Sequence, residues 1–165
     1  MTEIVFNCFI CDQPVIEGDL AYSYSVQSEK LERGEYEVFN SAGILSTCEK
    51  CKKRFDLERQ LDAKIYQHLV TAKPSMVPRA KDVALIHNTD DCACCESGIR
   101  DGEYLSTGVH SDELWGHNSI QPLTVTRSFT LCLPCSESTN FSSYVEKIID
   151  HVISVNRKEL IRSAT

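Results

Sequence analysis

The chain has 165 residues, of which 42% are hydrophobic and 25% are charged. This composition is typical of a globular protein and excludes a disordered chain. Its apolar runs fall far short of the roughly 18 residues of a membrane-spanning helix, and a net charge of −7 argues against a general nucleic-acid coat.

The N-terminus and the cysteine content bear on the cellular compartment. Residues 1–8 lack the basic region and the long apolar stretch of a signal peptide, so we expect a cytoplasmic protein. Nine cysteines in a reducing compartment indicate metal binding before disulfides.

Eight of the nine cysteines form four CxxC pairs in a repeated register. They are Cys8, Cys11, Cys48 and Cys51, followed 84 residues later by Cys92, Cys95, Cys132 and Cys135. In the same register Gly18 matches Gly102 and Val15 matches Ile99. We interpret the chain as an internal tandem duplication.

A proline-containing stretch separates the two copies. Its two prolines cannot continue a helix. We therefore expect a first zinc-binding repeat at residues 1–72, a linker at 73–85 and a second repeat at 86–165. Residues 83–86 would form an added strand or a packing segment.

Each repeat is expected to contain a β-hairpin between its two CxxC pairs. In the first repeat, alternation of large and small side chains predicts a strand over residues 19–26, a polar loop over 27–35 and a returning strand over 36–39. The corresponding segments of the second repeat are residues 104–109, 110–121 and 123–129.

A helix is expected to begin at the second CxxC pair of each repeat. After Cys51, apolar residues recur at helical spacing, at Leu57, Leu61, Ile65 and Leu69. Asp62 is among the charged residues predicted to lie away from that face. After Cys135 a wider apolar stripe extends through residues 145–161, and Pro134 suits a first helical turn.

The eight paired cysteines are the predicted metal ligands. A CxxC pair presents two thiolates on one tight turn, and two pairs complete the tetrahedral shell that zinc prefers. A closed shell leaves no position for water or substrate, so we expect two structural zinc ions. Free buried thiols, redox dithiols and iron–sulfur ligation are the alternatives. Cys94, where the first repeat has Ile10, is interpreted as a non-ligand that could exchange with a neighbour.

The order of CxxC knuckle, hairpin and CxxC at a helix start resembles the treble-clef class of zinc fingers. The resemblance covers both repeats and implies an α+β fold of two tandem treble-clef-like units. It also implies that Cys8 and Cys11, and again Cys92 and Cys95, form the knuckles. The alternative is a zinc ribbon, whose second pair lies on another hairpin; the amphipathic stretch after each second pair disfavours it.

HNH nucleases share the treble-clef fold, so a degenerate nuclease is one alternative. Those enzymes typically carry a His-His or Asp-His dipeptide and a metal-binding histidine on the helix. Here His110 and His117 lie in the predicted loop without that dipeptide, and His68 and His151 lie far along the helices. A loop histidine is more often a solvent-facing polar residue. We predict no catalytic residues and no enzymatic activity.

Nucleic-acid binding is a further alternative. The cations that could contact phosphates surround the second pair of the first repeat, at Lys50, Lys52, Lys53 and Arg54. They could equally offset the negative charge of the zinc thiolates. The corresponding stretch of the second repeat has no cation, which disfavours a paired basic surface.

Protein–protein interaction is the function that the sequence favours. The last helix, at about residues 140–162, has apolar residues such as Val155 and Ile161 off its main stripe. These would pack on the first repeat's helix or contact a second copy or another protein. Trp115, in the predicted polar loop, would either belong to the core or, if exposed, anchor a basic partner. We therefore expect an adaptor or regulatory protein with no membrane partner.

Overall fold

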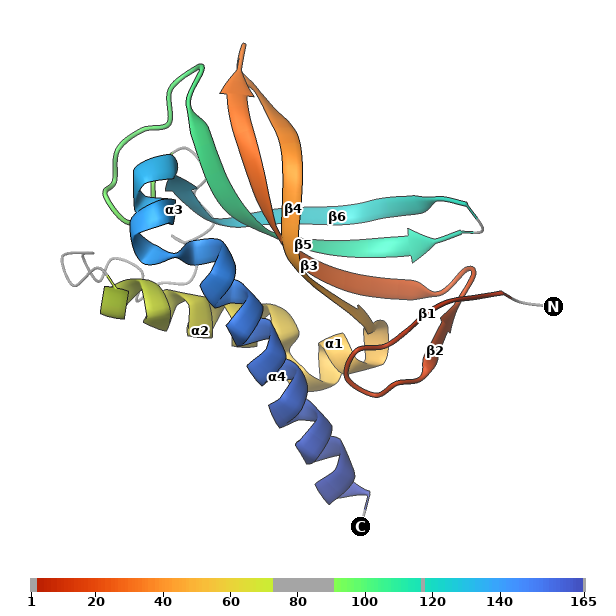
Figure 1. Ribbon diagram of the computed structural model, residues 1–165. Helices are drawn as coiled ribbons and strands as arrows, with labels where there is room; N and C mark the ends of the chain where they lie inside the picture. Colours follow the sequence, from red (N-terminus) through yellow and green to blue (C-terminus); the bar gives the residue numbers. More distant parts are fainter. Residues whose placement is uncertain (1–2, 73–90, 117, 165) are drawn as a thin grey trace.

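The computed structural model describes residues 3–72, 91–116 and 118–164. The first repeat contains β1 (Ile4–Asn7), β2 (Pro14–Ile16), β3 (Leu20–Glu32), β4 (Glu35–Cys48), α1 (Glu49–Phe55) and α2 (Leu57–Ala72). The second contains β5 (Tyr104–Trp115), β6 (Ile120–Cys132), α3 (Leu133–Thr139) and α4 (Phe141–Ser163) (Figure 1). The fold is α+β, as predicted. The predicted linker and the segment at 83–86 lie outside the described residues.

The two long hairpins join into one antiparallel sheet with the strand order β4-β3-β5-β6. Each repeat contributes one hairpin, and the seam between repeats is β3 against β5, paired without a register shift. At the centre of the seam Ser25 lies opposite Val109. These two positions differ by 84, the offset of the duplication, so the repeats are related across the seam by an approximate two-fold axis.

Hydrogen bonds at the two ends of the seam follow the same relation. The Gly18 amide donates to the carbonyl of Trp115 at 2.8 Å, and the equivalent Gly102 amide donates to the carbonyl of Leu31 at 2.6 Å. Leu31 and Trp115 also differ by 84. Gly18 and Gly102 have φ angles of 92° and 87°, a left-handed region that favours glycine. Each repeat therefore uses its glycine turn to hold the hairpin of the other.

The hairpin strands are longer than predicted, and the predicted loops at 27–35 and 110–121 are wrong. The first hairpin turns in only two residues, Arg33 and Gly34, both with positive φ, which suits a tight β-hairpin turn. β3 pairs with β4 on one side and with β5 on the other. Backbone pairing on both sides holds a polar segment in a strand that its side chains alone do not predict.

The helices begin where the sequence predicts, but each expected helix is broken into two. Cys48 and Cys132 are the N-cap residues of α1 and α3. Asp56 and Asn140, again 84 residues apart, separate the paired helices with φ angles of 47° and 53°. Asp and Asn tolerate the left-handed conformation better than most residues, so the break has a local cause.

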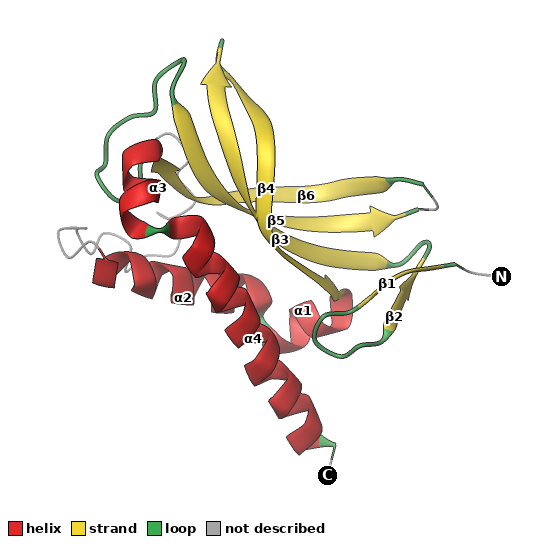
Figure 2. Cartoon of the chain, viewed as in Figure 1, coloured by secondary structure: helices red, strands yellow, loops and turns green. Residues whose placement is uncertain are grey.

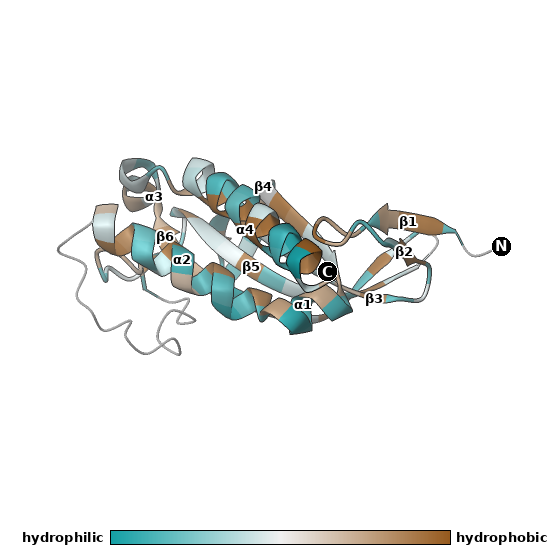
Figure 3. Ribbon diagram, turned by 90° about the horizontal axis from the view of Figure 1, so that it is seen from below, coloured by the Kyte–Doolittle hydropathy of each residue, from teal (hydrophilic) through white to brown (hydrophobic). Residues whose placement is uncertain are grey.

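The core lies between the sheet and the helices. α1, α2 and α4 cover one face of the sheet (Figure 2), and a view from below places them in front of it (Figure 3). The predicted apolar stripe of α2 is confirmed, since Leu57, Leu61, Ile65 and Leu69 are fully buried. In α4, Val145, Ile148, Ile149 and Val152 are buried as predicted. Among the described residues, every helix is too short or too polar to span a lipid bilayer.

Candidate metal centres

The first cysteine cluster combines a turn with a strand–helix junction. Cys8 and Cys11 lie on the turn between β1 and β2, Cys48 ends β4, and Cys51 lies in the first turn of α1. The four Sγ atoms lie within 4.8 Å of one another. The Cys8 amide donates to the Gln13 carbonyl at 2.9 Å, which closes the turn and presents both of its thiols on one side.

The second cluster repeats this arrangement. It contains Cys92, Cys95, Cys132 and Cys135, whose Sγ atoms also lie within 4.8 Å of one another. In each repeat the turn is tied to the strand that carries the later pair. The Phe9 amide donates to the Ser46 carbonyl at 3.0 Å, and the Ala93 amide donates to the Thr130 carbonyl at 2.8 Å. Sequence-distant pairs are thereby held together by the backbone.

The thiol spacing fits a tetrahedral metal ion. Four sulfur atoms at about 2.3 Å from a central zinc ion are about 3.8 Å apart. The Sγ atoms of Cys11 and Cys48 lie 3.8 Å apart, as do those of Cys95 and Cys132. All nine cysteines have free thiols. The two four-cysteine groups are therefore able to hold metal ions, as the sequence predicts.

Crowding of the thiols shifts their pKa values in opposite directions. A hydrogen bond with Cys51 lowers the pKa of Cys8 to about 4, and one with Cys94 lowers the pKa of Cys92 to about 4. The hydrogen bond to Cys8, together with burial, raises the pKa of Cys51; burial first of all raises the pKa of Cys135. Each cluster thus favours one thiolate over its neighbours, and a divalent cation would supply the charge that deprotonates the others.

Cys94 is a residue of the hydrophobic core beside the four-thiol group, and its thiol is hydrogen-bonded to that of Cys92. Its side chain is 8% exposed, and the equivalent Ile10 is 2% exposed. The second cluster gathers its four thiols without it. The position of Cys94 therefore matches an aliphatic core residue of the first repeat and favours the non-ligand interpretation.

His110 is buried in a polar network that joins the repeats. Its ring lies in β5 with 1% exposure, so the prediction of a solvent-facing loop histidine is wrong. Nε2 of His110 lies 2.8 Å from Oδ1 of Asp62 in α2, and Nδ1 lies 2.5 Å from the hydroxyl of Tyr22 in β3. The sequence places these three residues far apart, and only the β3–β5 seam under α2 brings them together.

Asp62 is 3% exposed, and its predicted place on the charged face of the helix is also wrong. A polar residue can occupy a buried helix face when a partner from another element meets it. A sequence signal for this position exists, because Asp62 lies three and seven residues before Ile65 and Leu69 of the apolar stripe.

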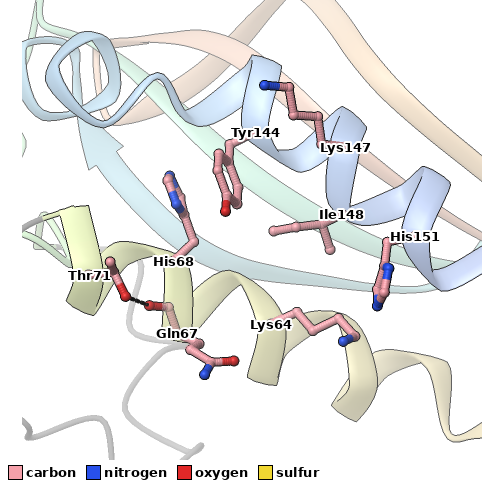
Figure 4. A pocket seen from close by; sticks show the side chains of 8 residues that line it. All are labelled: Lys64, Gln67, His68, Thr71, Tyr144, Lys147, Ile148 and His151. Atoms are coloured by element: carbon pink, nitrogen blue, oxygen red, sulfur yellow. Dashed lines mark hydrogen bonds between the residues drawn. The ribbon is translucent and has the colours of Figure 1, made fainter.

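The remaining histidines lie elsewhere. His87 and His117 are outside the described residues. His68 and His151 line a groove between α2 and α4 (Figure 4), where the His68 ring stacks on Tyr144 with 3.4 Å between centroids. The described histidines therefore lie in two different settings, a buried network and a surface groove.

The four cations predicted as nucleic-acid contacts lie on α1: Lys50, Lys52, Lys53 and Arg54. Two of them are engaged by carboxylates. Nζ of Lys52 lies 2.6 Å from Asp112 and 3.3 Å from Glu58, and Nζ of Lys53 lies 3.0 Å from Glu49. Lys52 thus ties the first repeat's helix to β5 of the second repeat.

The three predicted partner contacts differ in exposure. Trp115 ends β5, where its ring packs against Phe6 at 5.0 Å and its Nε1 donates to Glu113 at 3.0 Å. It is half-buried, and its predicted place in a polar loop is wrong. Val155 and Ile161 lie on α4 and are 40% and 69% exposed, so these two remain accessible.

No known protein resembles this chain closely enough to indicate its family. Comparison with models of known protein families, with curated proteins and with solved structures gives no significant match. The description of the chain therefore rests on its own features, above all the two duplicated four-cysteine clusters.

Proposed function

We propose that the protein is a zinc-stabilised binding module, an adaptor or regulatory protein that acts through protein–protein contacts. The observation that carries this proposal is the geometry of the two clusters. In each, two Sγ atoms from different CxxC pairs lie 3.8 Å apart and all four thiols lie within 4.8 Å. This is the shell of a closed, structural zinc site, in which every ligand position belongs to the protein.

Each cluster with its hairpin and helix forms a treble-clef-like unit in this proposal. The supporting feature is the position of the later pair, since Cys48 and Cys132 end long strands and cap the following helices. Their partners Cys51 and Cys135 lie on those helices. A zinc ribbon would place the later pair on a hairpin instead.

A binding role rather than catalysis is supported by the surroundings of the clusters. A shell of four thiolates leaves no open position on zinc for water or substrate. His110, one of the two histidines considered for a nuclease, has both ring nitrogens within hydrogen-bond distance of the buried Tyr22 and Asp62. It would have to leave this network to reach a substrate.

Exposed apolar side chains provide surfaces for a protein partner, either another protein or a second copy of this chain. Val155 and Ile161 are exposed on α4. On the edge strands, Phe39 of β4 and Leu123 and Val125 of β6 are 60%, 51% and 56% exposed. An edge strand with apolar side chains readily pairs with another strand.

Metal analysis tests the zinc part of the proposal. Undamaged, reduced protein should contain two zinc ions per chain, and Cys11→Ser or Cys95→Ser should each reduce the content toward one. Cys94→Ala is the matched control and should retain two. A wild-type content well below one ion, or loss of zinc from Cys94→Ala, would contradict the proposed ligand sets.

Self-association and crosslinking test the binding role. A photocrosslinking residue at position 161 should trap a second copy or a defined partner, and Ile161→Asp with Val155→Asp should weaken that association. The same residue at position 158, also exposed on α4, is the control. A monomer that traps nothing from position 161, yet cleaves plasmid with added magnesium or manganese, would favour the nuclease alternative.

A further inference from the structure

A groove with a cavity volume of about 500 Å³ runs between α2 and α4. Figure 4 shows the side chains from both helices that line it. Its volume lies within the range of small-molecule sites. Both helices use their apolar faces to cover the sheet, and the buried Ile148 forms part of the groove's lining. The groove is thus formed where the helix of the first repeat packs beside the helix of the second repeat.

The ionisable side chains that line the groove, apart from one tyrosine, are all basic ones. Lys64 and His68 come from α2, and Lys147 and His151 come from α4, whereas no carboxylate lines it among the described residues. In α2, no acidic residue follows Asp62 along the chain. In the part of the chain that the structure describes, neither lysine has a carboxylate within ion-pair distance. Lys64 and Lys147 are therefore two positive charges in the lining of the groove, in a chain of net charge −7.

The groups at the two ends of the groove differ. Figure 4 shows Lys64 and His151 projecting from opposite helices toward the same end. At the other end the His68 ring lies flat on Tyr144, and Nε2 of His68 lies 3.0 Å from the carbonyl of Thr139. Because a carbonyl only accepts, Nε2 carries its hydrogen there. His68 and Tyr144 therefore form a fixed wall of the groove. Within the described ranges Lys64 and His151 have no hydrogen-bond or ion-pair partner, so they can meet a ligand.

We propose that this groove binds the phosphate groups of a small anionic ligand, such as a nucleoside triphosphate or an inorganic polyphosphate. Phosphate oxygens accept charge-assisted hydrogen bonds from lysine and further hydrogen bonds from the N–H of a histidine ring. Lys64 and His151 would contact one phosphate group, and Lys147, which lines another part of the groove, would add positive charge to it. A ligand with several phosphates matches cations supplied by two helices better than a single carboxylate does.

The test uses the zinc-loaded, full-length protein in low salt. Pyrophosphate and ATP are titrated separately while backbone amide resonances are followed by NMR. Saturable shifts should centre on residues 64–71 and 144–151. Equal affinity for both ligands would identify an inorganic anion, and tighter binding of ATP would identify a nucleotide.

Variants connect the binding to the groove. Lys64→Gln should weaken binding about tenfold, because it removes a hydrogen bond to a charged group. Lys147→Gln, at an exposed position where folding is not at risk, should also weaken it. Lys158→Gln removes the same charge from an exposed position of α4 outside the groove and should leave the affinity within about twofold. No saturable shifts at millimolar ligand, or equal weakening by Lys158→Gln, would overturn the proposal.

Discussion

Tyr24 and Gly108 occupy equivalent positions of the two repeats, 84 residues apart, and lie against each other at the centre of the sheet. A Cβ atom built on Gly108 would lie 2.1 Å from the Tyr24 hydroxyl and 2.9 Å from the ring carbon that bears it. Tyr24 is fully buried. The two repeats cannot both carry a large side chain here, so the approximate two-fold relation is broken where the repeats meet.

Gly108→Ala should therefore lower the free energy of unfolding by about 2 kcal/mol, because the added methyl group overpacks a closed core. Denaturant unfolding of the zinc-loaded protein measures this. Gly98→Ala is the control, since its Cβ would come no closer than 3.7 Å to another side chain. In the double variant Gly108→Ala/Tyr24→Phe, removal of the Tyr24 hydroxyl should recover part of the lost free energy of unfolding. If the losses of the two single variants simply add in the double variant, the two residues are not in direct contact.

Asp62→Ala should destabilise the protein by about 3 kcal/mol, because it leaves Nε2 of His110 buried without the carboxylate 2.8 Å away. The control is Glu146→Ala, at the equivalent position of α4, where the side chain is exposed. Urea unfolding should show a lower free energy of unfolding for Asp62→Ala and little change for Glu146→Ala. Similar effects at the two positions would mean that the network contributes no stability.

Zinc binding should release protons and weaken as the pH falls. Burial is the largest cause that raises the pKa of Cys11, and the hydrogen bond to Cys8 is the largest that raises the pKa of Cys51. Both thiols therefore hold their protons at pH 7 in the metal-free cluster and become thiolates only as the pH rises. Zinc must displace at least these two protons, so its affinity should fall at least about 100-fold per pH unit of acidification.

Calorimetry in buffers of different ionisation enthalpy counts the released protons. The second cluster should behave alike, since the pKa values of Cys132 and Cys135 are also raised, in both cases chiefly by burial. A zinc affinity that does not change between pH 6 and pH 7, roughly the range in which these thiols stay protonated, would contradict the expectation.

Lys52→Ala should lower the free energy of unfolding by about 1 kcal/mol, because Lys52 joins α1 to β5 through Asp112 at 2.6 Å. Lys53, whose side chain is 73% exposed, is the control and should have little effect on stability. If the cations of α1 contact nucleic acid instead, substitution of either lysine by alanine should weaken nucleic-acid binding in a gel-shift assay, and that binding should depend steeply on salt. The comparison separates a structural role of these cations from the nucleic-acid alternative.

Local features of the chain were predictable because their causes lie within a few residues. The cysteine spacing gives the two four-thiol groups, and Pro134 and the apolar stripe give the helix after Cys135. The helix breaks at Asp56 and Asn140 were missed, although both residue types favour the left-handed conformation. The preference of Asp and Asn for the left-handed conformation is a weak sequence signal, because the surrounding structure often overrides local conformational preferences.

The sequence by itself determined the duplication, the two four-cysteine groups and the helix starts, because a constant offset of 84 and a CxxC spacing do not depend on where the rest of the chain lies. The tertiary structure decided how the copies meet. Pairing of β3 with β5 turns predicted loops into strands, and it places His110 beneath Asp62. Backbone hydrogen bonds between strands carry no side-chain signature, so a seam between repeats becomes visible only once the strands are paired in space.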